Sequence, residues 1–195
     1  MSHTQAMQSS PGPTLSVNRR PRPLVLRALS LIGEIASRPS ALWDWIRVVY
    51  WLIRRPGDAG WWFRQAFNSQ APLQEATPFL SFPCVRWLRK HLRPGMRVFE
   101  YGTGGSTVFF ARHGCDVVAV EGREQWTEAT RKRLEAEGLS ERVELRYRDT
   151  VGNHYDDLKV YVEEVRNGGP WDLILVDGAD RHMCMLVAVE CLKPG

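Results

Sequence analysis

The chain has 195 residues, of which 44% are apolar and 25% charged, the balance of an ordinary soluble protein. Its net charge of +4 hides an asymmetry. Residues 1–95 carry 13 Lys and Arg against 4 Asp and Glu, whereas residues 96–195 carry 13 against 18. The acidic second half is a poor surface for nucleic acid, so we expect no nucleic-acid partner. The basic first half suits anionic lipid or an acidic partner, or it serves solubility alone.

The cysteines and histidines argue against a metal centre. No two cysteines form a C-x-x-C pair, and the histidines show no spacing typical of metal ligands. We therefore expect no metal site, and reduced structural thiols that suit a cytoplasmic protein. The cysteines are Cys84, Cys115, Cys184 and Cys191, and the histidines are His3, His91, His113, His154 and His182.

The N-terminal part of the chain predicts a tail followed by a helical extension. Residues 1–23 are rich in Pro and Ser and lack the apolar core of a signal peptide, so we expect a disordered tail. Residues 24–81 are basic and aromatic, with helices expected over 24–37 and 41–55. The apolar run 41–53 contains charges and is too short to span a bilayer.

The expected helix over 41–55 has one apolar face. Ser40 is placed to cap its start, and Asp44 lies in its first turn, where the helix dipole favours an acid. Such a helix could pack on the rest of the chain, join a homodimer, or lie on a membrane through residues 41–62. The apolar residues recur at helical spacing and are Leu42, Trp45, Ile46, Val49, Leu52 and Ile53.

From residue 82 the pattern changes to an alternation of short apolar strands and helices. Four strand-then-helix units in a row predict a parallel sheet covered by helices, so we assign residues 82–195 to an α/β domain. A first helix is expected over 82–92. Strands are expected over 97–101, 116–120, 142–147 and 171–176, and helices over 106–113, 123–137, 157–167 and 181–192.

A glycine-rich turn follows the first strand of this domain. Gly102 and Gly104 let a ligand approach the backbone closely, a device that dinucleotide-binding enzymes also use. Thr107 stands where the third glycine of G-x-G-x-x-G would be, and Glu100 lies two residues before the first. A carboxylate there repels a pyrophosphate but suits the ammonium and sulfonium of S-adenosylmethionine.

Three further acids follow the other predicted strands. Glu121 lies 19 residues beyond Gly102, close to the interval that places an acid on ribose hydroxyls. Asp149 could accept a proton from an adenine amino group, or could cap a turn. Asp177 ends the fourth strand before a glycine, at the sheet edge where ligands bind in open α/β sheets.

Together these motifs resemble the class I, Rossmann-like S-adenosylmethionine-dependent methyltransferases, particularly the small-molecule O-methyltransferases. The similarity covers residues 82–195 and includes the E/D-x-G-x-G motif at 100–104, the acids after strands two and three, and Asp-Gly-Ala-Asp at 177–180. Residues 192–195 are similar to the turn before that family's fifth strand. The resemblance implies S-adenosylmethionine as cofactor. It implies a cofactor site made by Glu100, Tyr101, Gly102, Thr103, Gly104, Ser106, Thr107, Glu121, Asp149 and Asp177.

The resemblance also implies a reaction and an incomplete fold. The family's sheet has seven strands in the order 3-2-1-4-5-7-6, so four strands predict a domain truncated at its C-terminus. We expect methyl transfer to a small-molecule acceptor, with Asp177 as the candidate catalytic residue near the reacting methyl group. His182 is a weaker candidate base, because Asp180 and Arg181 stand where many relatives have a histidine.

Two other functions fit the sequence less well. One is a nicotinamide-dependent oxidoreductase, against which Glu100 and the missing third glycine argue. The other is a non-catalytic Rossmann-like module that acts through its basic, aromatic N-terminal helices on a membrane or a protein partner.

Overall fold

The computed structural model describes residues 33, 39–57, 60, 72–150 and 155–194. The chain divides into two compact units, residues 1–70 and 71–195. The tail predicted for 1–23 and nearly all of the helix predicted for 24–37 lie outside the described residues.

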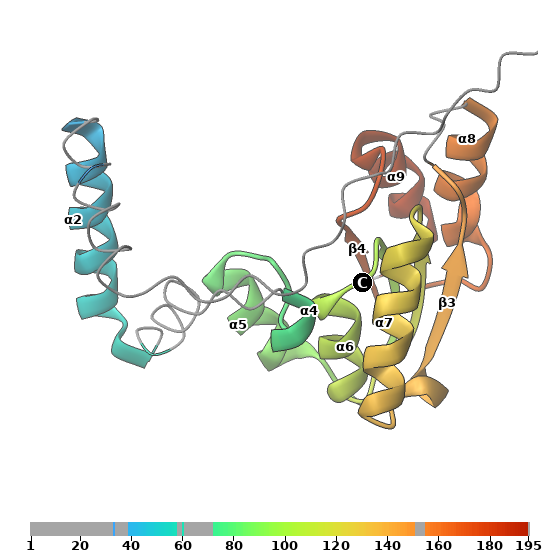
Figure 1. Ribbon diagram of the computed structural model, residues 1–195, viewed down its shortest axis with the longest axis horizontal. Helices are drawn as coiled ribbons and strands as arrows, with labels where there is room; N and C mark the ends of the chain where they lie inside the picture. The colour runs from blue at the N-terminus through green and yellow to red at the C-terminus, as the bar shows by residue number, and fades with distance from the viewer. Residues whose placement is uncertain (1–32, 34–38, 58–59, 61–71, 151–154, 195) are drawn as a thin grey trace, which may run out of the picture. The chain divides into compact units, whose positions relative to one another are not determined.

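The described part of the first unit is mainly one helix, α2 (Pro39–Arg54; Figure 1). It begins two residues before the predicted start, so Ser40 lies inside the helix and the prediction that it caps the start is wrong. Several of its apolar side chains are exposed. No helix in the described part of the chain is long and apolar enough to cross a membrane.

The second unit contains a parallel sheet of four strands in the order β3-β2-β1-β4. The strands are β1 (Arg97–Tyr101), β2 (Asp116–Glu121), β3 (Val143–Tyr147) and β4 (Leu173–Val176). The helices are α4 (Pro72–Glu75), α5 (Phe82–His91), α6 (Gly105–Arg112), α7 (Glu124–Ala136), α8 (Tyr155–Glu163) and α9 (Arg181–Ala188). Short 3-10 turns are η1 (Ser140–Arg142), η2 (Glu164–Arg166) and η3 (Val189–Cys191).

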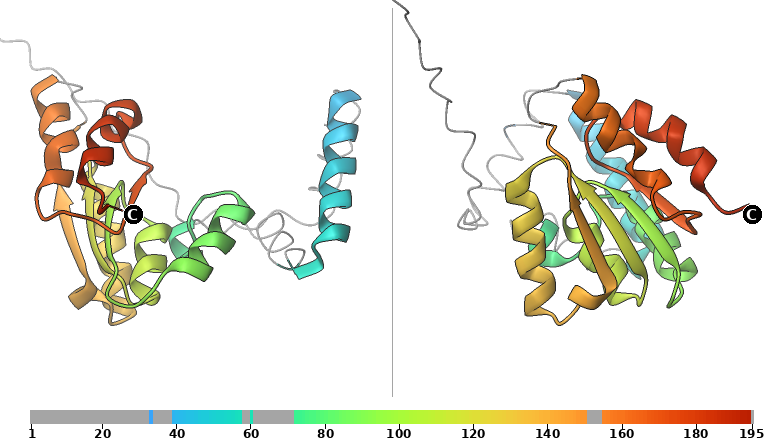
Figure 2. Two further views of the ribbon diagram at one scale, coloured as in Figure 1. Left: turned by 180° about the vertical axis from the view of Figure 1, so that it is seen from behind. Right: turned by 90° about the vertical axis from the view of Figure 1, so that its right-hand side faces the viewer.

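Helices cover both faces of the sheet, as βαβ connections require (Figure 2). On one face, α4, α6 and α7 pack over a small core formed by Ala76, Val108, Ala111 and Leu134. On the other face, α8 and α9 enclose a larger aromatic core that includes Phe99, Tyr101, Tyr161 and Trp171. The predicted α/β class and Rossmann-like arrangement are therefore confirmed.

The register brings the carboxyl ends of the strands together at one edge. Tyr101 of β1 lies beside Val120 of β2 and Val176 of β4, and Glu121 lies beside Tyr147 of β3. The turns that follow these residues must therefore leave the sheet at the same edge, where ligands of open α/β sheets bind.

Some predicted boundaries shift where 3-10 turns intervene. The third strand begins at Val143 because residues 140–142 form η1. The last predicted helix ends as α9 at Ala188 and continues as η3. Trp171 lies just before β4, where it forms a parallel bridge with Leu192.

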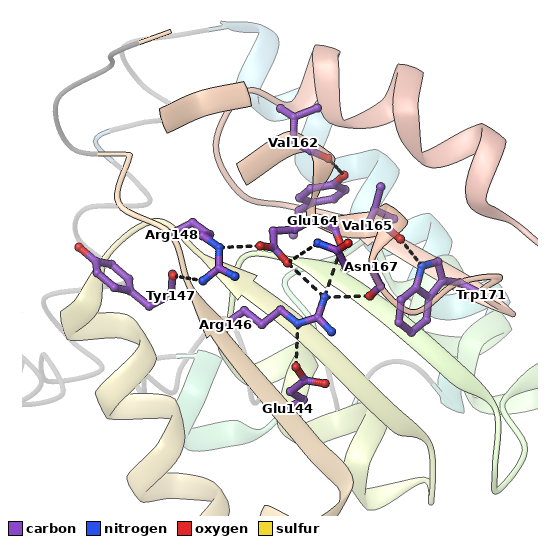
Figure 3. A network of polar contacts seen from close by, with 10 residues as sticks. Glu144, Arg146, Tyr147, Arg148, Val162, Glu164, Val165, Asn167 and Trp171 are labelled. Carbon is purple, nitrogen blue, oxygen red and sulfur yellow. Dashed lines mark hydrogen bonds and ion pairs between the residues drawn. The ribbon is translucent and has the colours of Figure 1, made fainter. Parts of the chain in front are cut away.

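A buried acid joins β3 to the turn after α8 (Figure 3). The carboxylate of Glu164 is 5% exposed and lies 2.5 Å from Nε of Arg148 and 3.1 Å from Nη1 of Arg146. Arg146 also donates to the backbone oxygen of Asn167 at 2.9 Å and pairs with Glu144 at 2.8 Å. The network holds the end of β3 against η2, next to the loop that carries Asp149.

Replacing Glu164 with Ala is expected to lower the free energy of unfolding by about 3 kcal/mol, because Arg146 and Arg148 would lose a buried partner. Glu163→Ala is the matched control. The carboxylate of Glu163 is 44% exposed and pairs with the exposed Arg166, and such a surface ion pair contributes little to stability. Urea unfolding of both variants measures the difference. Equal effects from the two substitutions would contradict a stabilising role for the buried network.

Candidate functional site

The glycine-rich turn after β1 lies tightly against the turn after β4. Gly102 has a φ of +95°, and its N–H donates to the carbonyl of Val120 at 2.7 Å. A Cβ atom at this position would lie 3.3 Å from backbone atoms of Asp177 and Gly178. Only glycine both adopts a positive φ readily and leaves room for this close approach of the two turns. The two turns therefore form one wall at the carboxyl edge of the sheet.

Beneath this turn lies a buried carboxyl group. The side chain of Glu100 is fully enclosed and accepts hydrogen bonds from the hydroxyls of Ser106 and Thr107, the latter at 2.6 Å. Thr107 Oγ1 in turn accepts the N–H of Gly104 at 3.0 Å. One acid on β1 thus fixes the first turn of α6 and, through Thr107, the backbone of the glycine-rich turn.

Burial changes the acidity of this carboxyl group. Loss of water raises the pKa of Glu100 from 4.5 to about 8, although the hydroxyls of Ser106 and Thr107 oppose the shift. The carboxylates of Asp177 and Glu121 raise the pKa further. The carboxyl group of Glu100 therefore keeps its proton at a higher pH than an exposed glutamate does.

The second acid of the site is held by backbone amides. One oxygen of Glu121 accepts the N–H and the hydroxyl of Thr103, at 3.0 and 3.1 Å, and the other accepts the N–H groups of Gly122 and Arg123 at 2.9 and 3.0 Å. These bonds join the end of β2 to the glycine-rich turn and fix the orientation of the carboxylate. The carboxylate is half-buried, and these four bonds occupy its lone pairs, so a ligand hydroxyl would have to replace or share one of them.

The structure places the other predicted acids at the same edge with more exposure. Asp177 follows β4 and pairs with Arg181 at 2.6 Å, its side chain 39% exposed. Asp149 is exposed two residues after β3, in the loop whose Arg148 N–H donates to the carbonyl of Glu121 at 2.9 Å. His182 is exposed in the first turn of α9. Sequence reasoning did not predict that Arg181 would pair with Asp177.

Tyr101 differs from the other predicted site residues, because its side chain lies in the core. Its hydroxyl donates to the carbonyl of Val162 at 2.5 Å, and its ring packs against that of Tyr161. The side chain therefore cannot line the crevice on the side of Glu100, and any contact with a cofactor is left to its backbone. Tyr161, which sequence reasoning missed, reaches from α8 to the backbone of Gly178.

A hollow of about 430 Å³ lies elsewhere, at the opposite end of the strands. Its charged walls include Arg142, which pairs with Asp116, and Arg97, which stacks on Trp171 with 4.9 Å between guanidinium carbon and ring centre. These side chains already satisfy one another, so we assign no ligand to the hollow. The described residues contain no cluster of three or more His, Cys, Asp or Glu able to hold a metal ion.

Comparison with known proteins relates the chain to solved structures only. No family model matches the sequence, and no curated protein matches it. The structure is similar to cofactor-bound Rv0187 from MTB, with a TM-score of 0.51 and 21% identity over 72% of this chain and 70% of that one. The O-methyltransferase TomG from Streptomyces achromogenes has a TM-score of 0.48 and 23% identity, over 69% of this chain and 66% of that one. An O-methyltransferase from Bacillus cereus has a TM-score of 0.48 and 21% identity, over 69% of this chain and 67% of that one.

The likeness to Rv0187 shows a shared fold, and the parallel sheet covered by helices is Rossmann-like. The chain spans roughly two thirds of the length of these three structures. Open α/β sheets bind ligands at the carboxyl edge, whereas the reaction has to be argued from the side chains at that edge.

Proposed function

We propose that this chain binds S-adenosylmethionine at the carboxyl ends of β1 and β2 and transfers its methyl group to a small-molecule acceptor. The observation that carries the proposal is the buried carboxyl of Glu100 beneath the glycine-rich turn. When bound, S-adenosylmethionine supplies a methyl group attached to a positively charged sulfur. The same ligand carries an ammonium group, for which a desolvated carboxylate is a strong partner.

The chemistry of the crevice fits this cofactor better than a dinucleotide. Carboxyl groups lie near the carboxyl ends of three neighbouring strands, at Glu100, Glu121 and Asp177, and the last two contribute to the raised pKa of Glu100. A pyrophosphate brought to this edge would meet a set of acids. A cationic ligand instead relieves their mutual repulsion, so the site disfavours a nicotinamide dinucleotide.

Each acid has a role that follows from its place. Glu121, held by backbone amides, would accept the ribose hydroxyls. Asp149 would face the adenine, because it follows β3 beside the end of β2. Asp177 would lie near the reacting methyl group, since the turn after β4 touches the glycine-rich turn. Methyl transfer from a sulfonium depends chiefly on orientation, so these residues would act mainly by positioning.

The intact carboxyl network also favours a cofactor-binding enzyme over a non-catalytic module. In a module without a ligand, the hydroxyls of Ser106 and Thr107 alone would have to offset the unfavourable desolvation of this acid. The exposed His182 would serve as a base only if the acceptor placed its hydroxyl beside the first turn of α9.

Calorimetric titration of the 195-residue chain with S-adenosylhomocysteine tests the proposal. We expect saturable binding that Glu121→Ala weakens by at least about tenfold, because a charged hydrogen-bond acceptor contributes roughly 1.5–3 kcal/mol. Glu124→Ala, an exposed acid at the start of α7, is the matched control and should bind like the original chain. A folded chain that does not bind S-adenosylhomocysteine, or that binds NAD in its place, would contradict the proposal.

A further inference from the structure

Helix α2 carries a continuous stripe of exposed aliphatic side chains. Leu42, Ile46, Val49 and Ile53 follow one another at intervals of four, three and four residues, which places them on one face of the helix. Their exposed fractions are 49%, 47%, 50% and 74%. We call these four residues the aliphatic stripe.

A second row runs beside the aliphatic stripe with the same spacing. Trp43, Arg47, Tyr50 and Arg54 each follow a stripe residue by one position, so aromatic and basic side chains alternate along one flank of the helix. The guanidinium carbon of Arg54 lies 5.1 Å from the ring centre of Tyr50. Arg47 approaches Asp44 only to 3.9 Å, with both side chains largely exposed. These four residues form the aromatic-basic row.

The small area of the aliphatic stripe argues against a protein as its main binding partner. A helix of 16 residues is about 24 Å long and about 10 Å wide, so the stripe offers roughly 240 Å². A stable protein interface buries about 800 Å² on each partner. A lipid surface has no such minimum of complementary shape, because it adapts to an apolar helix of any width.

The charge of the surrounding sequence specifies which lipid surface fits. Residues 1–70, the unit that contains α2, carry 9 Lys and Arg against 3 Asp and Glu. Trp and Tyr beside Arg are the side chains that settle at the level of lipid headgroups, with their apolar parts inward and their polar ends in water. We propose that α2 lies along an anionic lipid surface, with the aliphatic stripe among the acyl chains and the aromatic-basic row at the headgroups. This inference is independent of methyl transfer.

Co-sedimentation of the full chain with lipid vesicles tests the proposal. We expect binding to phosphatidylcholine vesicles that contain phosphatidylserine and much weaker binding to phosphatidylcholine alone. Ile46→Asp with Ile53→Asp should abolish binding. Arg47→Gln with Arg54→Gln should weaken it roughly 25-fold, since each basic residue near an anionic surface contributes about fivefold.

Val160→Asp with Val189→Asp is the matched control, because these side chains are 53% and 71% exposed in the second unit. It should leave binding unchanged, and all variants should retain the circular dichroism of the original chain. Two results would overturn the proposal. One is a folded chain that does not sediment with the anionic vesicles. The other is self-association, seen by analytical ultracentrifugation, that the Ile46→Asp, Ile53→Asp pair abolishes while vesicle binding persists.

Discussion

Glu100→Gln should weaken S-adenosylhomocysteine binding by about 10- to 100-fold and at the same time stabilise the free protein at alkaline pH. The amide keeps the shape of the carboxyl group but cannot carry the negative charge that an ammonium group needs. Loss of a charged hydrogen bond of this kind corresponds to roughly 1.5–3 kcal/mol. Isothermal titration calorimetry measures the affinity, and urea unfolding measures the stability.

The weaker binding and the higher stability expected of Glu100→Gln both follow from the pKa of Glu100. Its folded-state value of about 8 exceeds its ordinary value of 4.5, so the folded chain binds the proton more tightly than the unfolded chain. The free energy of unfolding therefore falls as the pH rises from 4.5 through 8. Glutamine does not titrate, so we expect Glu100→Gln to be more stable than the original chain above pH 8, by roughly 2 kcal/mol or more.

Binding should show the matching pH dependence. An ammonium beside Glu100 favours the ionised form, so below pH 8 the ligand must displace a proton, and affinity should fall by up to about tenfold per pH unit. Titrations in buffers of different ionisation enthalpy would report that proton. Glu121→Gln is the control: it should weaken binding but keep the proton release, shifted to lower pH because the carboxylate of Glu121 contributes to the raised pKa of Glu100. A pH-independent affinity, or a Glu100→Gln chain that is less stable at every pH, would show a structural role instead.

The sheet was predictable because buried parallel strands appear in sequence as short apolar runs between turns. The bounds predicted for β1 agree with the structure, and those for β2 differ by one residue. Helix α4 was not predicted, because four residues are too few to show helical periodicity. Its position depends on packing against α6 and α7, which pattern alone does not reveal.

The acids of the candidate site were predictable for a related reason, since each lies within two residues of the end of a strand and parallel strands share one carboxyl edge. Tyr101 was predicted at the cofactor site without a direction for its side chain, although the alternation of residues along a strand indicates that direction. Successive residues of a strand face opposite sides, so Glu100 toward α6 places Tyr101 toward α8. The approach of Tyr161 to Gly178 joins a helix to a turn far along the chain, and no local pattern encodes such a contact.

The approach of Tyr161 to Gly178 leads to the second prediction with a large expected effect. Gly178→Ala should destabilise the protein by about 1–3 kcal/mol, because the new Cβ would clash with the hydroxyl of Tyr161 and lie 2.9 Å from the amide nitrogen of Gly102. The clash falls where the turns after β1 and β4 meet. The same substitution should therefore weaken S-adenosylhomocysteine binding as well as lower the melting temperature, by about 2–4 °C per kcal/mol in a chain of this size.

A double-mutant cycle separates the two contacts. Tyr161→Phe alone should cost little, because the buried hydroxyl has no hydrogen-bond partner in the described structure. Combined with Gly178→Ala it should recover only part of the lost stability, since the contact with Gly102 remains. Gly57→Ala is the matched control, because Gly57, like Gly178, does not have a positive φ and nothing lies within 4 Å of its Cβ position. If Tyr161→Phe restored nothing, the contact between the two turns, and not the tyrosine, would limit the size of residue 178.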